Sequence, residues 1–444
     1  MKQNKATLYL LFLSFALLII NANVTSNTLK PFADELVSLT ANFGFFNNFD
    51  FRAGNNLLGG QGYSYSVLNS SGPFSAVGSV IAWSLTKNIY ITRPFNFIFV
   101  LIVNTVLSYK ITTHFDLDSR YIVLSNLTLV TIPWWYGSLY SLGELPSIII
   151  FFYAIILFNK NRLLSMVLFS FSIFFSKLIL LLFFGGFYST YIFNQLFTNK
   201  KINFGRVFKD FFTFLVPMLV WLVFVHLYSD FGVFQYFDDL INYLILNHQS
   251  SDTSQFSNFS FLNIALIIQN MQWSIVDIYK VLFFPLFTIF ILIKHKREII
   301  KKLNLEIYGA VGSISAFYIW FWLFSTTKWI KYSSQMIYIC LGFVLLFLFI
   351  AIQNRNRIYI LVASLSLLLF TSSLTVLIVS LLLFSFYFLT KKDLITLFTI
   401  IFLLSGSNLL FETTRKETFE INIQKCEEQL LNTICQENYL GVKF

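Results

Sequence analysis

The sequence predicts an all-α polytopic membrane protein with about 13 transmembrane helices and a long first exported loop that carries interfacial helices. Composition is the first reason, because 57% of the 444 residues are hydrophobic and only 12% are charged, with a mean hydropathy of +0.71. The second reason is that the charges lie between long apolar runs, as loops lie between spans. This pattern excludes soluble enzymes, nucleic-acid-binding proteins and disordered scaffolds. The net charge of +10 comes mainly from membrane-flanking Lys and Arg.

Individual spans follow from bilayer thickness, since a helix needs about 20 apolar residues to cross, or fewer where Lys or Arg snorkel at its ends. The spans predicted in this way are residues 7–23, 94–110, 121–138, 146–159, 163–178, 179–197, 211–228, 279–293, 305–325, 333–352, 358–373, 374–390 and 394–411. Two long apolar stretches must each be divided into two helices, one at Lys177 and one between Thr371 and Thr375.

The distribution of basic residues tests this count, because a wrong number of spans would scatter Lys and Arg over both faces. With the N-terminus inside, most Lys and Arg fall in cytoplasmic turns. The stretch 210–279 contains neither Lys nor Arg but holds several Asp, as an exported loop should. The pattern therefore predicts an integral, multi-pass protein of a bacterial inner or plasma membrane, with a cytoplasmic N-terminus and an exported C-terminus.

Two regions are distinguished along the chain. Residues 1–411 form a transmembrane domain with an exported loop at 24–93, and residues 412–444 form a short exported tail in which Cys426 and Cys435 could pair. The first 23 residues also admit an interpretation as a cleaved signal peptide, although no small-x-small cleavage site follows them.

The exported loop is polar and long, so we expect it to have a function. Pro31 begins a helical pattern with Asp34 and Glu35 in its first turn, which suits a short interfacial helix. Residues 73–86 are apolar but too few to span, and we interpret them as a second interfacial or re-entrant helix.

Six short motifs follow one another through the predicted loops and helix ends. They are Phe32-Ala33-Asp34-Glu35, Ser71-Gly72-Pro73-Phe74, Thr92-Arg93-Pro94-Phe95-Asn96, Gly143-Glu144-Leu145-Pro146, Phe175-Ser176-Lys177 and Lys331-Tyr332. Their order and spacing resemble the GT-C superfamily of polyprenyl-phosphate-sugar-dependent glycosyltransferases, in particular the protein mannosyltransferase and lipid A aminoarabinose transferase branch. The resemblance covers residues 1–200 and then 328–346. It implies a helical membrane enzyme that transfers a sugar from a polyprenyl phosphate on the outer face.

Such a transfer needs a base for the acceptor and cations for the departing phosphate. The resemblance assigns catalysis to Asp34 as the general base, with Glu35 beside it and Glu144 as a second carboxylate. Glu144 follows a cluster of Trp and Tyr that is typical of a membrane interface. The alternative is that these three carboxylates only complement helix N-termini.

The residues assigned to substrate binding are Asp50, Arg52, Arg93, Lys177, Lys328, Lys331 and Tyr332. A Lys within an apolar run is costly, which favours an acidic or phosphate partner for Lys177. The alternative is a loop Lys that divides the run. Lys328 and Lys331 flank Trp329 on the exported side, where they either hold phosphate or snorkel.

No zinc-binding helix is predicted, because none of the four His has a His partner at the i, i+4 spacing. No cofactor is assigned, although the exported carboxylates could hold a divalent ion, joined by His226 and His248. Asp238 and Asp239 lie in the second exported loop, as part of a lid or of a solvated turn. Cytoplasmic nucleotide-sugar chemistry is disfavoured by the absence of a Gly-rich phosphate loop.

The sequence thus predicts a membrane glycosyltransferase whose partners are a polyprenyl-phosphate-linked sugar, a lipid, glycan or protein acceptor, and membrane lipids. A polysaccharide polymerase or ligase is the enzymatic alternative, but it would use exported Arg and a larger late loop. A lipid-linked sugar transporter or flippase is the other alternative, and it would show paired repeats.

Overall fold

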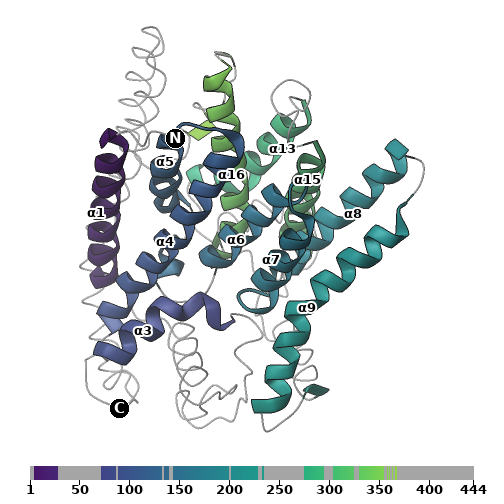
Figure 1. Cartoon of the computed structure of the whole chain (residues 1–444). Coiled ribbons are helices and arrows are strands. Elements are labelled where there is room, and N and C mark those ends of the chain that lie inside the picture. Colours follow the sequence, from purple (N-terminus) through teal and green to yellow (C-terminus); the bar gives the residue numbers. More distant parts are fainter. Residues whose placement is uncertain are drawn as a thin grey trace.

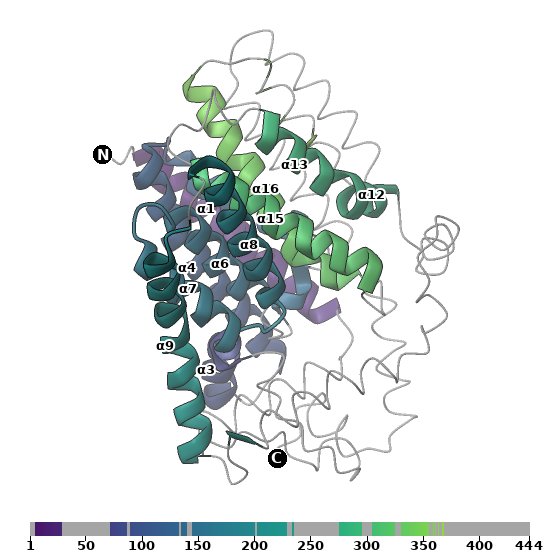
Figure 2. The ribbon, with the colours of Figure 1, turned by 90° about the vertical axis from the view of Figure 1, so that its right-hand side faces the viewer.

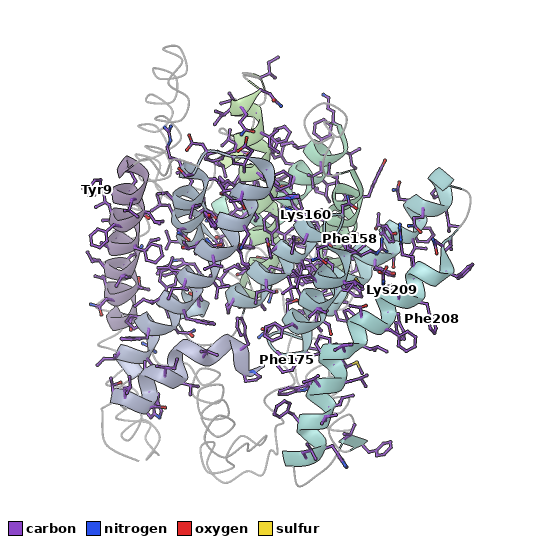
Figure 3. The ribbon with its side chains drawn as sticks, in the orientation of Figure 1. Tyr9, Phe158, Lys160, Phe175, Phe208 and Lys209 are labelled. Carbon is purple, nitrogen blue, oxygen red and sulfur yellow. The ribbon has the colours of Figure 1, made fainter. Side chains whose placement is uncertain are left out.

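The computed structural model describes residues 5–28, 72–86, 89–132, 135–139, 144–199, 202–228, 275–294, 304–324 and 330–354, with isolated positions at 233–234, 358, 360, 363 and 366–367. Within these ranges every regular element is a helix (Figure 1). The all-α membrane fold predicted from the sequence is confirmed. Large apolar side chains stay exposed on the outside of the bundle, among them Tyr9 of α1 and Phe208 of α9 (Figure 3), as lipid-facing side chains do.

The first helices form an antiparallel group. The long helices α1 (Lys5–Thr28) and α4 (Ile89–Phe115) pack together, and α5 (Arg120–Thr128) continues into the 3₁₀ turns η4 (Leu129–Thr131) and η5 (Trp135–Ser138). The turn between α4 and α5 is made by two Asp residues. Asp116 adopts a positive φ of 54°, which Asp tolerates better than most residues, and Asp118 accepts a hydrogen bond from the Arg120 N–H at 2.9 Å.

The central helices follow with short connections. They are α6 (Glu144–Leu157), α7 (Arg162–Phe174), α8 (Leu180–Asn199) and α9 (Phe204–Tyr228). The Asn161 side chain caps α7 by accepting from the Leu164 N–H at 3.1 Å. A turn at residues 175–179 separates α7 from α8, which confirms the division at Lys177.

The later helices contain two π-helical segments. The short α12 (Ile275–Ile278) runs through the π segment η7 (Tyr279–Phe283) into α13 (Phe284–Lys294), and α15 (Asn304–Ile319) ends in the π segment η8 (Trp320–Phe324). The last long helix, α16 (Ile330–Gln353), is almost wholly buried and lies in the middle of the bundle.

The described helices correspond to the first ten predicted spans, while spans 358–373, 374–390 and 394–411 fall outside the described ranges apart from isolated positions. Among the described residues, five helices are long and apolar enough to cross a membrane: Leu8–Ser26, Ile91–Phe115, Leu180–Phe197, Phe204–Phe224 and Ser333–Gln353. Two predicted span starts differ from the observed helix starts by five residues or more.

The first difference concerns α4, which begins at Ile89 rather than at residue 94 and contains Pro94. Near a helix start Pro loses only one backbone hydrogen bond, so it does not have to be the first helical residue. The second concerns α9, which begins at Phe204 rather than at residue 211. Arg206, Lys209 and Asp210 interrupt the apolar run in the sequence, but the helix continues through them, and Asp210 pairs with Arg162 of α7.

One short helix lies across the others. The segment formed by η3 (Pro73–Ala76) and α3 (Val77–Thr86) runs across the lower end of the bundle in Figure 1. The predicted second helix of the exported loop is therefore present, and it packs along α4.

We name each end of the bundle after the arginine that lies there, Arg93 or Arg162. The Arg93 end is where α1, α7, α9 and α15 end and where α4, α6, α8 and α16 begin (Figures 1 and 2). At the opposite end, the Arg162 end, the Gln353 side chain at the end of α16 donates a hydrogen bond to the Asp116 carbonyl beyond α4.

The closest helix pair is α8 with α15. A Cβ on Gly312 would lie 2.0 Å from Thr190 Oγ1 and 2.3 Å from the Gly186 carbonyl oxygen. The Ser313 hydroxyl donates to the Phe183 carbonyl at 2.8 Å. Small residues of this kind allow helix backbones to touch inside a membrane.

Candidate functional site

Arg93 is one of the largest fully buried side chains, with 1% of its surface exposed. It lies in the second turn of α4, and its Nη1 donates to the Ser26 carbonyl oxygen at 2.9 Å, near the end of α1. One turn along α4, Asn96 donates through Nδ2 to the Ser138 carbonyl oxygen of η5. A buried guanidinium requires such polar partners, because an uncompensated charge in a low-dielectric interior is costly. The start of α4 is thereby attached to α1 on one side and to η5 on the other.

The η3–α3 segment joins two of the motifs identified in the sequence. The Gly72 N–H donates to the Ser176 carbonyl at 2.7 Å, and the Phe74 N–H donates to the Phe175 carbonyl at 3.1 Å. Figure 3 shows Phe175 beside this segment. The Gly-Pro motif at the end of the first long loop therefore contacts the Phe-Ser-Lys motif of the α7–α8 turn, about 100 residues later in the chain.

The same segment also reaches α4. The Phe74 ring lies edge-on to Phe99 of α4 at 5.3 Å between ring centroids, and edge-on to Phe171 of α7 at 5.1 Å. Further along, a Cβ on Gly78 would lie 2.9 Å from the Asn96 Cα. Residues 72–86 thus connect the helix of Arg93 to the turn of Lys177.

Lys177 occupies the turn between α7 and α8 and is half-buried. Its N–H donates to the Ser172 carbonyl at 2.9 Å, and its carbonyl accepts from the Leu180 N–H at 3.1 Å, where α8 begins. The Lys is therefore not in the middle of a span. It stands at the N-terminus of a 20-residue helix, where the backbone dipole adds positive potential.

Three further predicted site residues lie where helices begin. Glu144 is the first residue of α6, and Lys331 and Tyr332 are in the first turn of α16, which packs against α6. These positions place all three at the Arg93 end by their backbone. The predicted site residues Asp34, Glu35, Asp50, Arg52 and Lys328 lie outside the described residues.

Lys280 is a basic residue at this end that the sequence interpretation missed. It lies in the π segment η7, is 8% exposed, and interacts with Asp277 one turn earlier. The neighbouring Leu282 carbonyl accepts from the Tyr318 hydroxyl of α15 at 3.3 Å. The available signal was a Lys inside the predicted span 279–293, since π segments and intramembrane charges both concentrate at functional positions.

A polar network in the bundle interior was also missed. Asn104 of α4 donates to Asn126 Oδ1 of α5 at 2.8 Å and accepts from the Tyr338 hydroxyl of α16 at 2.9 Å, while Ser108 donates to Ser125 at 2.9 Å. Of these side chains, Asn104, Ser108, Ser125 and Tyr338 line a small cavity. The network holds three helices in register and does not contain a titratable acid or base of the kind that glycosyl transfer needs.

Among the described residues, no group of three or more His, Cys, Asp or Glu side chains could hold a metal ion. His226, one of the two His residues considered for such a site, is exposed in the last turn of α9. His248 lies outside the described residues, as do Asp238, Asp239, Cys426 and Cys435.

The Arg93 end therefore collects basic residues and the N-termini of α4, α6, α8 and α16. Each helix N-terminus presents backbone N–H groups and a positive dipole end. This arrangement favours an anionic group, such as a phosphate, at the Arg93 end of the bundle.

Comparison with known proteins is informative for the fold. No family model matches the sequence, and no curated protein matches it significantly. Among solved structures, the chain is similar to ArnT from Cupriavidus metallidurans bound to undecaprenyl phosphate, with a TM-score of 0.56 and 13% identity over 97% of this chain and 82% of that one. The apo form of the same ArnT gives a TM-score of 0.54 at 12% identity, with the same coverage. The GT-C-like fold expected from the motifs is confirmed.

Proposed function

We propose that this chain, a membrane protein with a GT-C-like fold, is a glycosyltransferase that takes a sugar from a polyprenyl-phosphate donor. The acceptor is a lipid, a glycan or a protein on the membrane face that carries the Arg93 end. The observation that supports this most is the similarity of 97% of the chain to a structure solved with undecaprenyl phosphate. The basic residues and helix N-termini at the Arg93 end are independent support, since they suit a phosphate.

The proposed reaction follows from the residues. The Asp34 carboxylate removes a proton from the acceptor hydroxyl or amine as that atom bonds to the anomeric carbon of the sugar. The bond from that carbon to the donor phosphate oxygen breaks, and the lipid phosphate leaves with the negative charge. Lys177 and Lys331 are proposed to stabilise this charge, with Arg52, Lys328 and Tyr332 completing the phosphate-binding group.

Arg93 has a supporting role in this proposal because it is fully buried. It holds the end of α1, from which the segment with Asp34, Glu35 and Asp50 departs, against α4. Glu144 is proposed as the second carboxylate, which orients the acceptor or holds a divalent ion. The proposed orientation, with the N-terminus in the cytoplasm of a bacterium and the C-terminus outside, places this chemistry on the outer face.

The test is sugar transfer by the purified protein from a panel of radiolabelled polyprenyl-phosphate sugars. We expect Asp34→Asn to abolish transfer while the variant remains folded. The matched control is Asp118→Asn, which alters a half-buried carboxylate in the α4–α5 turn at the Arg162 end and should leave transfer unchanged.

Other outcomes of this test would indicate a different base or a different function for the chain. Normal turnover of Asp34→Asn would remove the base assignment but keep the enzyme class. No transfer from any donor, together with protein-dependent movement of lipid-linked sugar across liposomes, would favour a transporter. Polymerisation of a preassembled lipid-linked glycan would favour a polysaccharide polymerase or ligase.

A further inference from the structure

Gly72 lies directly against main-chain atoms of the α7–α8 turn. It is buried, and a Cβ at this position would be 2.2 Å from the Phe175 carbonyl carbon, 2.3 Å from its oxygen and 2.7 Å from the Ser176 nitrogen. All three are main-chain atoms of the α7–α8 turn. The backbone of Gly72, at φ −68° and ψ 168°, is extended and open to any residue. Glycine is therefore required here for space and not for its conformational freedom.

The contact is tight because both partners are held in place. Two hydrogen bonds, from the Gly72 and Phe74 N–H groups, connect the segment to the turn. Pro73 fixes its own φ between them. The Phe74 ring between Phe99 and Phe171 prevents the segment from tilting away. We call the hydrogen-bonded pair of segments, residues 72–74 and 175–177, the clasp.

Lys177 is the last residue of the second segment of the clasp. The Ser176 carbonyl that accepts from Gly72 belongs to the peptide bond whose nitrogen is that of Lys177. A displacement of this peptide by even 1 Å would move the Cα of Lys177 and the start of α8 with it. A side chain at Gly72 must cause such a displacement, because real Cβ atoms do not approach backbone within 3 Å.

We infer that Gly72 is a positioning residue for Lys177, and that the end of the first long loop sets the place of this ammonium group in the binding site. The ligand in this inference, a polyprenyl phosphate, rests on the proposed function. Gly72 itself does not touch the ligand. It acts through the α7–α8 turn.

Binding of undecaprenyl phosphate to the purified full chain tests the coupling. Losing a charge-assisted contact to phosphate should weaken binding about 10-fold to 100-fold in Lys177→Met. We expect Gly72→Ala to weaken binding by about tenfold, and the double variant to bind no worse than Lys177→Met alone. Gly185→Ala is the matched control, because a Cβ there meets nothing within 4 Å, and it should bind like wild type.

Independent, multiplying losses in the double variant would overturn the inference, since they would show that Gly72 affects binding by another route. Unchanged binding in a folded Gly72→Ala would also overturn it. If Gly72→Ala does not fold, Phe74→Leu is the milder variant, which loosens the clasp without a backbone clash. It should give a smaller loss that also disappears in the Lys177→Met background.

A second measurement keeps this inference separate from the proposed function. The variant Lys177→Cys, in a chain with Cys426→Ser and Cys435→Ser, is labelled with a membrane-impermeant maleimide. We expect Gly72→Ala to change the labelling rate several-fold and Gly185→Ala to leave it unchanged. Equal rates would refute the clasp. If wild type does not bind undecaprenyl phosphate, the proposed function fails while the labelling result still decides whether Gly72 positions residue 177.

Discussion

Replacing Asp210 by Asn should clearly destabilise the bundle, because it breaks a buried ion pair at the Arg162 end. Asp210 lies in the second turn of α9 with 2% of its side chain exposed, and Arg162 begins α7 with 18% exposed. Arg162 Nε donates to both carboxylate oxygens, at 2.7 and 2.8 Å, and the Tyr188 hydroxyl of α8 donates to Oδ2 at 2.7 Å. Three helices therefore meet at one carboxylate.

The expected loss in the free energy of unfolding follows from these contacts. An Asn offers one acceptor oxygen, and its NH₂ group faces the donors of Arg162 and Tyr188. Removing one partner of a buried ion pair costs about 3–5 kcal/mol, because the other charge stays buried. The partial exposure of Arg162 reduces the expected loss to about 2–4 kcal/mol. The guanidinium keeps its contact with the Tyr191 ring, at 4.4 Å from the ring centroid, so it does not leave the cluster.

The assay is the free energy of unfolding in mixed micelles for Asp210→Asn, Arg162→Met and the double variant. Because the double variant leaves no unpaired charge, it should lose clearly less than the sum of the two single variants. The control is Asp118→Asn, whose 3.0 Å pair with Arg120 is more than a third exposed on both sides and contributes about 0–1 kcal/mol. A loss below about 0.5 kcal/mol in Asp210→Asn, or strictly additive losses, would refute this reasoning.

Further predictions concern packing and buried hydrogen bonds, each measured as the free energy of unfolding in the same micelles. Gly312→Ala should cost about 1–3 kcal/mol by forcing α8 and α15 apart, whereas Gly205→Ala, with only one atom within 4 Å, should change little. An equal effect at both glycines would contradict the close approach. Tyr338→Phe should cost about 0.6–1.5 kcal/mol, because the Asn104 oxygen loses its donor; no loss would mean that water replaces the hydroxyl. Arg93→Met should cost about 1–3 kcal/mol through the lost contact with α1, and wild-type stability would count against the role given to this residue.

Span positions were predictable because bilayer thickness imposes a length on every apolar helix. The division of a continuous apolar run at Lys177 was found for this reason, and the structure has a turn there. The short η3–α3 helix was found because its residues are too few to span. Both are local properties, which the sequence displays directly.

Contacts between distant segments were not predictable in the same way. The Gly72 and Lys177 motifs were each identified, but nothing in either motif shows that they touch. Asp210 stands at the edge of the predicted span 211–228, and an acidic residue next to an apolar run carries no mark of its partner 48 residues earlier. Lys280 was included in the predicted span 279–293, because a criterion based on average hydropathy tolerates one charge. These misses share one cause, which is that tertiary partners are a property of the fold.

The glycine contact between α8 and α15 has a consequence for how the molecule can rearrange. Helices separated by side chains can slide by small rotamer changes, but two backbones in direct contact have little room to slide past each other. We therefore expect any step of a working cycle that shifts the start of α8 to move α15 with it, as one rigid unit. The π segment at the end of α15 would then transmit the shift to the part of the bundle around Lys280. The hinges of such a cycle would thus lie outside this pair, in the turn before α8 and in the π segments.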